Sequence, residues 1–244
     1  MHFHGKPVWV TGAGRGIGLQ VAMLFHGLGA QVLGLDLAWG EGAYPFETLS
    51  LDITDTTAVD HLCATRPGPE VLVNAAGILR MGTSDSLSLE DWRACFDVNV
   101  GGPFHLLRRL VPGFKARGSG AIVNIASNAA HVPRLGMAAY CASKAALVSF
   151  SHCVALELAP FGVRCNVVSP GTTDTPMLRG MGLDAEGIRR TVAGLPAQFK
   201  LGIPLAKAAT PLDIAQAVVF LASPQAGHIT LQDLVVDGGA TLGA

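Results

Sequence analysis

Three residue types that together could oxidise an alcohol lie within one short stretch of the chain. Ser127 is followed by Tyr140, and Lys144 comes four residues after the tyrosine. The segment from Met137 to Leu158 contains no Gly or Pro and is rich in Ala, Leu and Ser, which predicts a helix. Because residues four apart share one face of a helix, the Tyr140 hydroxyl and the Lys144 ammonium are expected to approach one cavity.

This spacing suits acid–base chemistry. A free tyrosine has a pKa of about 10, and a fixed cation favours the phenolate and lowers that pKa. Tyr140 would then take a proton from a substrate hydroxyl while hydride leaves the same carbon, and Ser127 would hydrogen-bond the reacting oxygen. The alternative is a buried tyrosine beside a solvated lysine, since this spacing is common by chance.

A glycine-rich turn near the N-terminus predicts a dinucleotide site. A short apolar strand at 7–10 runs into TGAGRGIG, with glycines at 12, 16 and 18, and residues 19–28 predict an amphipathic helix. Such glycines let the backbone approach a pyrophosphate at a helix N-terminus. The next strand, 31–35, ends at Asp36, whose carboxylate would accept hydrogen bonds from an adenosine ribose. This context disfavours a purely structural turn.

Two residues of this unit bear on the choice of nicotinamide cofactor. Asp36 favours NAD, because its carboxylate would repel the 2′-phosphate of NADP. Arg15, inside the glycine turn, is the opposite signal, since an arginine there could contact that phosphate. Asp36 outweighs it because the carboxylate would meet the phosphate at close range.

Polar or small residues also follow the later strands. Asp52 and Ile53, after a strand at 48–51, would frame the adenine ring, although Asp52 could instead cap the helix from about Thr56. NAAG follows a strand at 71–73, and PGTTDT follows one at 163–169. A long helix should continue past Asn99 with a kink at the Gly101–Gly102–Pro103 run.

This alternation of strands and helices predicts one α/β domain with a doubly wound parallel sheet covered by helices on both faces. Ligands of such sheets bind at the carboxyl ends of the strands, where every candidate residue falls. The composition of the 244 residues, 50% hydrophobic and 14% charged, fits a large core.

The composition also bears on other classes of protein. The net charge is −1 and no basic block occurs, which argues against nucleic-acid binding. Five cysteines without a CxxC pair, and a first strand that leaves no room for a signal peptide, indicate a cytoplasmic protein. No apolar run long enough to span a membrane is seen, and no membrane association is expected. His2 and His4 lack a third ligand, so no metal site is expected.

TGxxxGxG, NAAG, Asn99, Ser127, YxxxK and PG together resemble the short-chain dehydrogenase/reductase family, across the whole chain. The resemblance implies a Rossmann fold with seven parallel strands and a catalytic tetrad of Asn99, Ser127, Tyr140 and Lys144. Asn99 would hold a water in a proton relay through its helix kink, and Lys144 would also bind the nicotinamide ribose. The implied cofactor-binding residues are Gly12, Arg15, Gly16, Ile17, Gly18, Asp36, Leu37, Asp52, Ile53, Asn74, Ala75, Gly77, Tyr140, Lys144, Pro170, Gly171, Thr173 and Thr175.

Longer stretches resemble one branch of this family. They are AAGILRMG (75–82), AAHVPRLGMAAY (129–140), RCNVVSPGTTDTPM (164–177), QFKLGIPL (198–205) and HITLQDLVVDGG (228–239). That similarity implies NAD-dependent oxidation of a cyclohexadiene diol carboxylate to the catechol unit of siderophores, driven forward by aromatisation. It also implies a homotetramer, joined through the long helices that include Asn99 and Tyr140.

Three cations are candidates for holding an anionic substrate. Arg80 follows the NAAG turn, and Arg134 lies between Ser127 and Tyr140; either could hold a carboxylate with two hydrogen bonds. Lys200 lies in 177–205, a stretch without clear periodicity that predicts a substrate lid. Each cation could instead be solvated. His131, nearby, is expected to cap its loop.

Two rival functions remain open. One is an NADPH-dependent ketoreductase of the same family acting on another carbonyl substrate, which Asp36 opposes. The other is a non-catalytic NAD-sensing protein. Such a sensor need not keep Ser127, Tyr140 and Lys144 together, as this chain does.

Overall fold

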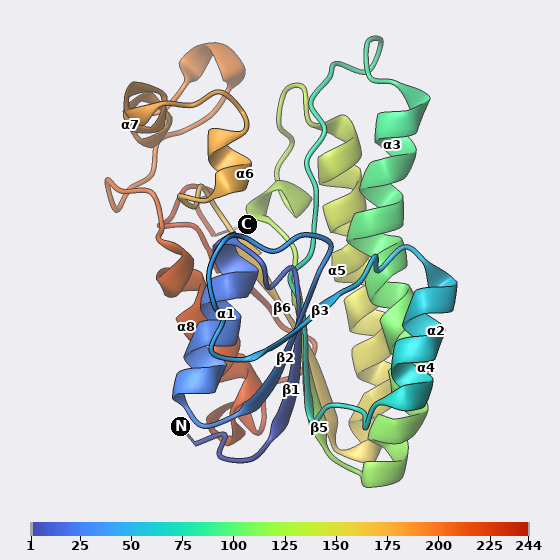
Figure 1. Ribbon diagram of the computed structural model, residues 1–244. Coiled ribbons are helices and arrows are strands. Elements are labelled where there is room, and N and C mark those ends of the chain that lie inside the picture. The colour runs from blue at the N-terminus through green and yellow to red at the C-terminus, as the bar shows by residue number, and fades with distance from the viewer. Residues whose placement is uncertain (1, 244) are drawn as a thin grey trace.

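The computed structural model describes residues 2–243. Its centre is one parallel sheet of seven strands, in the spatial order β3–β2–β1–β4–β5–β6–β7 (Figure 1). The strands are β1 Pro7–Thr11, β2 Gln31–Asp36, β3 Glu47–Ser50, β4 Val71–Asn74, β5 Gly120–Ile125, β6 Val163–Pro170 and β7 Asp233–Val236. The expected doubly wound α/β fold is confirmed.

Helices cover both faces of this sheet. In Figure 1, α1 and α8 lie on one face and α2, α4 and α5 on the other, while α6 and α7 lie above the carboxyl ends of the strands. The helices are α1 Gly16–Gly27, α2 Thr56–Thr65, α3 Leu89–Phe96, α4 Gly102–Arg117, α5 Ala138–Leu158, α6 Pro176–Arg179, α7 Ala185–Ala193 and α8 Pro211–Ala222.

The strands separate two hydrophobic cores because successive side chains of a strand point to opposite faces. In β4, Val71 and Val73 pack into the core under α1 and α8, whereas Leu72 packs into the core under α4 and α5. A strand buried on both faces reads as a continuous apolar run, which explains the high hydrophobic content of the chain.

The order of the strands opens a crevice at one place. β1 lies between β2 and β4, so the chain leaves β1 toward one edge of the sheet and later returns on its other side. Thr11, at the end of β1, holds the two turns together there: its Oγ1 accepts hydrogen bonds from the N–H groups of Ala75 and Ala76, each 3.1 Å away. The glycine turn and the NAAG turn are therefore neighbours.

The kink expected near Asn99 is present as a π-helical turn, Asp97–Gly101, between α3 and α4. The helix α2 is capped by Asp55, whose side chain accepts from the N–H groups of Thr57 and Ala58. Asp52 is therefore not its cap, and that alternative is wrong.

One helical stretch, Ala138–Phe161, is long and apolar enough to cross a membrane by length and composition alone. Its mean hydropathy is 1.2 over the most apolar window, of which 39% is buried. This stretch contains α5, which packs against β6 and the sheet, so it has the position of a core helix.

Candidate active site

The glycine turn forms a surface that only glycine permits. A Cβ on Gly12 would lie 2.7 Å from the amide nitrogen of Ala76, and a Cβ on Gly18 would lie 2.1 Å from the carbonyl oxygen of Gly12. Arg15, the first residue before α1, makes no side-chain cap. The N–H groups at the start of α1 are therefore left for a ligand, and a pyrophosphate fits them.

Asp36 lies directly over this turn. Its Oδ2 accepts a hydrogen bond from the N–H of Gly14 at 2.8 Å, and its Oδ1 accepts from Ala38 at 3.3 Å. A carboxylate oxygen has room for further donors, so the ribose hydroxyls of a nucleotide suit it. Arg15 is exposed and makes no ion pair within the described residues, and Leu37 is exposed beside Asp36.

The expected adenine-binding residues follow β3. Oδ1 of Asp52 accepts from the amide and the hydroxyl of Thr54, at 2.8 and 2.7 Å, which fixes the carboxylate. Ile53 is buried against α4, where a Cβ on Gly102 would lie 2.3 Å from its Cδ1. That both frame an adenine ring stays a prediction.

The residues of the NAAG turn have different positions. Asn74 is buried, and its Nδ2 donates to Oδ1 of Asn124 at 2.7 Å, so the side chain ties β4 to β5. Ala75 and Gly77 instead line a cavity. The Asn74 side chain therefore has a structural role between the two strands, and a contact of this residue with the cofactor stays a prediction.

That cavity, of about 390 Å³, lies at the carboxyl ends of the strands. It is lined by side chains that are far apart in the chain: Ser127, Tyr140 and Lys144 share it with part of the expected cofactor-binding set, Ile17, Ala75, Gly77, Pro170, Gly171, Thr173 and Thr175. Gly16 is adjacent, since a Cβ there would lie 3.5 Å from Thr175. The catalytic and nucleotide-binding candidates therefore form one site.

The catalytic candidates are held by the backbone around them. Lys144, only 4% exposed, donates from Nζ to the carbonyl of Ile125 at 2.8 Å, and Nζ lies 5.8 Å from the centre of the Tyr140 ring. Ser127 ends the segment after β5, where its Oγ accepts from the N–H of Ala129 at 3.2 Å. Both side chains thus face the cavity from the same edge.

Burial raises the pKa of the Tyr140 hydroxyl, and the hydrogen bond with Ser127 opposes that rise. Burial also lowers the pKa of the Lys144 ammonium to about 8. Ser127 is the side chain that opposes the rise in the pKa of Tyr140, and the lowering of the Tyr140 pKa by Lys144 stays a prediction. At neutral pH Lys144 still carries its proton, since its pKa stays above 7.

Asn99 is fully buried in the π-helical turn. Its Oδ1 accepts from the N–H of Ile78 at 2.9 Å, and its Nδ2 donates to the carbonyl of Ile78 at 3.0 Å and to Ser143 at 2.9 Å. The side chain thereby joins the loop after β4 to the helix that carries Tyr140. A water held at Asn99 stays a prediction.

The charges of the cavity have one sign. Its lining includes Arg134, Lys144 and Lys200 but no Asp or Glu. Burial lowers the pKa of both Arg134 and Lys200, and the charge of Arg134 lowers that of Lys200 further, so the two lie close together. Burying like charges is unfavourable without an anion between them.

Arg80 does not line this cavity. Its Nε lies 3.0 Å from Oδ1 of Asp91 in α3, with which it forms an ion pair. The structure therefore does not bring Arg80 together with the catalytic candidates, and its contact with the substrate stays a prediction. His131 pairs with Asp233 at 2.8 Å, which ties its loop to β7.

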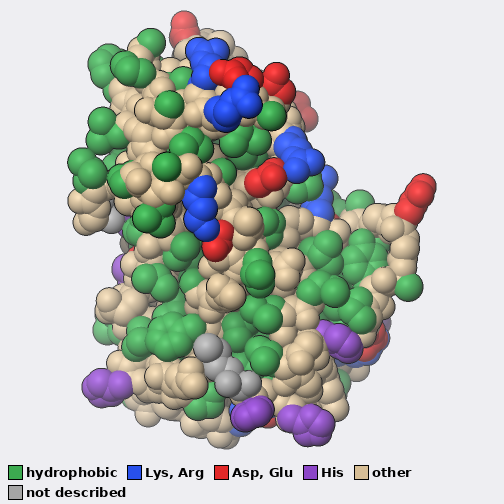
Figure 2. Space-filling model, turned by 90° about the vertical axis from the view of Figure 1, so that its left-hand side faces the viewer, with side chains coloured by type: hydrophobic (Ala, Val, Ile, Leu, Met, Phe, Trp, Pro, Cys, Tyr) green, Lys and Arg blue, Asp and Glu red, His purple; other side chains and the backbone are tan. Residues whose placement is uncertain are grey.

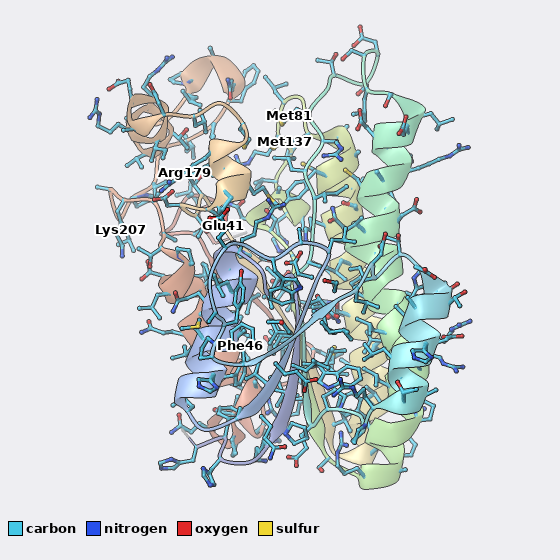
Figure 3. All side chains as sticks on the ribbon, in the orientation of Figure 1. Glu41, Phe46, Met81, Met137, Arg179 and Lys207 are labelled. Carbon is cyan, nitrogen blue, oxygen red and sulfur yellow. The ribbon has the colours of Figure 1, made fainter. Side chains whose placement is uncertain are left out.

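Sequence reasoning missed two groups of residues. Four of the six methionines line the cavity: Met81, Met137, Met177 and Met181. Figure 3 places Met81 and Met137 across from the chain segment of α6 and α7. Asp237 was also missed: its Oδ2 accepts from Asn128 at 3.2 Å, beside Ser127. The position of DGG at the end of the last strand was the available signal.

Within residues 2–243, no three His, Cys, Asp or Glu side chains are grouped so that they could hold a metal ion.

A Rossmann sheet that carries the glycine turn with Asp36, here called the nucleotide cradle, and a Ser–Tyr–Lys group defines a nicotinamide-dependent oxidoreductase. A family model described as enoyl-(acyl carrier protein) reductase matches residues 12–241. The chain belongs to the short-chain dehydrogenase/reductase family.

The relatives and solved structures agree with this assignment. The chain is 54% identical to 2,3-dihydro-2,3-dihydroxybenzoate dehydrogenase of Escherichia coli (strain K12), over 100% of both chains. It is 45% identical to the enzyme of the same name in Bacillus subtilis (strain 168), over 98% of this chain and 97% of that one. A solved short-chain dehydrogenase/reductase family protein superposes with a TM-score of 0.86 and 37% identity, covering 98% of each chain.

Proposed function

We propose that this protein oxidises 2,3-dihydro-2,3-dihydroxybenzoate to 2,3-dihydroxybenzoate with NAD, as a step in making catechol siderophores. One observation carries the substrate: the cavity beside Tyr140 is lined by three cations and no carboxylate, which suits a small anionic ring. The curated relatives from E. coli and B. subtilis bear the name of this activity.

Each residue of the site has its own role in the reaction. Tyr140, as phenolate, takes the proton of the substrate hydroxyl, and Ser127 hydrogen-bonds the same oxygen and holds it in place. A bound nicotinamide would supply the acceptor for the hydride that leaves the carbon. Lys144 keeps the Tyr140 end of α5 fixed to β5 through the carbonyl of Ile125. Loss of the hydroxyl proton and the hydride leaves a ketone, and its enolisation makes the ring aromatic, which favours the forward direction.

The cradle around Gly12, Gly14 and Gly18 would hold the pyrophosphate, and Asp36 would hold the adenosine ribose. The carboxylate of Asp36 is already fixed 2.8 Å from the N–H of Gly14. A 2′-phosphate would have to approach this charge, so NAD is the cofactor that the cradle favours. Arg15 is exposed and would be the contact for NADP.

The first test is an assay of NADH formation from the diene diol carboxylate with NAD or NADP. We expect turnover with NAD and little with NADP. The variant Tyr140→Phe should bind NAD unchanged and lose about 100-fold or more in kcat, because it has no ionisable hydroxyl. A folded wild type that binds NAD but leaves the diol unchanged would refute the substrate, and reduction of a 3-oxoacyl carrier substrate by NADPH would favour the ketoreductase.

Variants of Arg134 and Arg80 test which arginine binds the substrate carboxylate, and the second variant is the control for the first. Arg134→Met should raise KM for the diol about tenfold or more, because it removes a charged hydrogen-bond donor. Arg80→Met should leave KM nearly unchanged, since Arg80 pairs with Asp91 outside the cavity. The reverse result would show that Arg80, and not Arg134, binds the substrate carboxylate.

We further propose a cytoplasmic homotetramer, assembled through the outer faces of α4 and α5. Large apolar side chains stay exposed there in the single chain, including Phe104 of α4 and Leu156 of α5. Exposed apolar area of this kind on long helices is typical of subunit interfaces.

A further inference from the structure

The segment 177–205 has no polar tie to the body of the protein over most of its length. Among the described residues, every hydrogen bond and ion pair made by residues 181–202 stays within 178–203. Over 181–202 only Thr191 is buried. Segments with few buried contacts and no polar anchors open at low cost.

This segment nevertheless forms one wall of the cavity. Met181, Leu183, Thr191, Leu195 and Lys200 line it from this side, and Ser127, Arg134 and Tyr140 line it from the body. Figure 1 shows α6 and α7 standing over the carboxyl ends of the strands, opposite the start of α5. A substrate in the cavity therefore contacts both walls.

Lys200 is aimed into the cavity by a short turn. Leu195 and Lys200 exchange two backbone hydrogen bonds, at 2.8 and 3.2 Å, around the turn Pro196–Gln198. Phe199 closes that turn with φ +54, a left-handed conformation that is unusual for a bulky residue, and its side chain is 87% exposed. Strained backbone of this kind persists where it positions a functional group.

Each of the two walls contributes a cation to the lining of the cavity. Arg134 belongs to the body, Lys200 to the segment, and the charge of Arg134 lowers the pKa of Lys200. Asp237 is the carboxylate that acts on Arg134, and it is already bonded to Asn128, Gly239 and Thr241. With no acid in the lining, nothing in the cavity compensates the repulsion between the two walls.

We propose that the substrate carboxylate binds between Arg134 and Lys200 and thereby closes the 177–205 segment over the ring, so that only anionic substrates are enclosed. A carboxylate between the two cations attracts both of them, and these attractions outweigh the repulsion between Arg134 and Lys200. Binding of the substrate therefore supplies the free energy that closes the segment. This inference rests on the proposed function, because it uses the carboxylate of that substrate.

The experiment measures hydrogen exchange of residues 181–202 in the enzyme with NADH, alone and with 2,3-dihydroxybenzoate or catechol. These two probes differ only in the carboxylate. We expect 2,3-dihydroxybenzoate to slow exchange in this stretch and catechol to leave it unchanged. Equal protection by both would overturn the proposal, since closure would then not depend on the anion.

Variants at Lys200 test the same proposal through the affinity of the enzyme for 2,3-dihydroxybenzoate. Lys200→Met should bind 2,3-dihydroxybenzoate at least about tenfold more weakly and lose the protection, and Lys200→Arg should restore both. Lys207→Met is the matched control, because Lys207 pairs with Asp213 at 3.5 Å outside the cavity and lies on the same side of the molecule (Figure 3). Full protection in Lys200→Met would refute the proposal.

The wild type separates this proposal from the proposed function. Turnover of the diene diol without carboxylate-dependent protection would leave the function standing and overturn the closure. A wild type that neither oxidises the diol nor binds 2,3-dihydroxybenzoate would overturn both.

Discussion

Tyr140 lies in surroundings that oppose its ionisation. Burial raises the pKa of its hydroxyl, and the hydrogen bond with Ser127 is the contribution that lowers it. If the phenolate is the base, oxidation becomes faster as pH rises, up to the pH at which Tyr140 is fully ionised. Ser127 therefore tunes the base as well as orienting the substrate.

The variant Ser127→Ala should move the midpoint of this pH profile upward, because it removes the contribution that lowers the pKa of Tyr140. We also expect kcat to fall about 100-fold, as for loss of one donor to the reacting oxygen. The measurement is kcat/KM between about pH 6 and pH 10. Ser119→Ala, at an exposed serine, is the control; a midpoint that stays in place would mean that another group sets the profile.

The burial of Lys144 makes the free energy of unfolding depend on pH. Burial lowers its pKa in the folded protein from 10.5 to about 8. Between these values the unfolded chain binds more protons than the folded one, so stability rises with pH across this window, and the cost of burying the ammonium is present in full below about pH 8.

The variant Lys144→Met has no such charge. The free energy of unfolding of the wild type, relative to the variant, should therefore increase by up to about 3 kcal/mol between neutral pH and about pH 10.5. Urea unfolding of both proteins at the two pH values measures it. Lys207→Met, at an exposed lysine, should show no such change. A difference that is independent of pH would contradict the depressed pKa.

The roles of some individual residues could be predicted from the sequence, and those of others could not. Tyr140 and Lys144 follow from the helical period, and Gly12 and Asp36 from their places beside strands. Arg80 and Arg134 could not be separated, because both follow strand ends by several residues. Their difference arises only when α3 brings Asp91 to Arg80.

Among the elements, the junction of β1 and β4 is the one on which the cradle depends. Thr11 is fully buried and accepts from the N–H groups of Ala75 and Ala76. The variant Thr11→Val keeps the shape but leaves two amides without an acceptor. We expect it to lose about 2 kcal/mol of unfolding free energy and to raise KM for NAD.

The variant Thr11→Ser is the control for this junction. It keeps the hydroxyl and loses one methyl group, at a cost of about 1 kcal/mol. Urea unfolding and NAD titration of both variants measure the difference. Equal losses in the two would mean that the methyl group, and not the hydrogen bonds, holds the turns together.

The elements could be predicted where their pattern is local. Buried strands read as apolar runs, and the capping box of Thr210 and Asp213 marks the start of α8. The helices α6 and α7 were not predicted within 177–205. α6 has four residues and α7 has nine. The apolar face of α7 therefore repeats over only about two and a half turns, too few for the sequence pattern to mark a helix.

For the whole molecule, the outer face of the two long helices is the place where subunits are proposed to meet. Leu156 of α5 is 63% exposed, and Phe104 of α4 packs against Phe150 of α5 beside it. Figure 2 shows the opposite side, where Lys, Arg, Asp and Glu gather on the upper half of the face.

The variant Leu156→Arg should therefore give a smaller species than the wild type in light scattering, because it places a charge in an apolar contact. Glu157→Arg changes the charge at the neighbouring, more polar position and is the control. A Leu156→Arg protein of unchanged mass would place the subunit contacts elsewhere.

The bond between Asn128 and Asp237 spans 109 residues of the chain. A ribosome adds about 5–20 residues per second, so Ser127 leaves the ribosome several seconds before the carboxylate that anchors its neighbour exists. The glycine turn, Asp36 and the NAAG turn belong to the first third of the chain and are therefore synthesised well before this anchor. Chains stalled ahead of residue 237 should show no dehydrogenase activity.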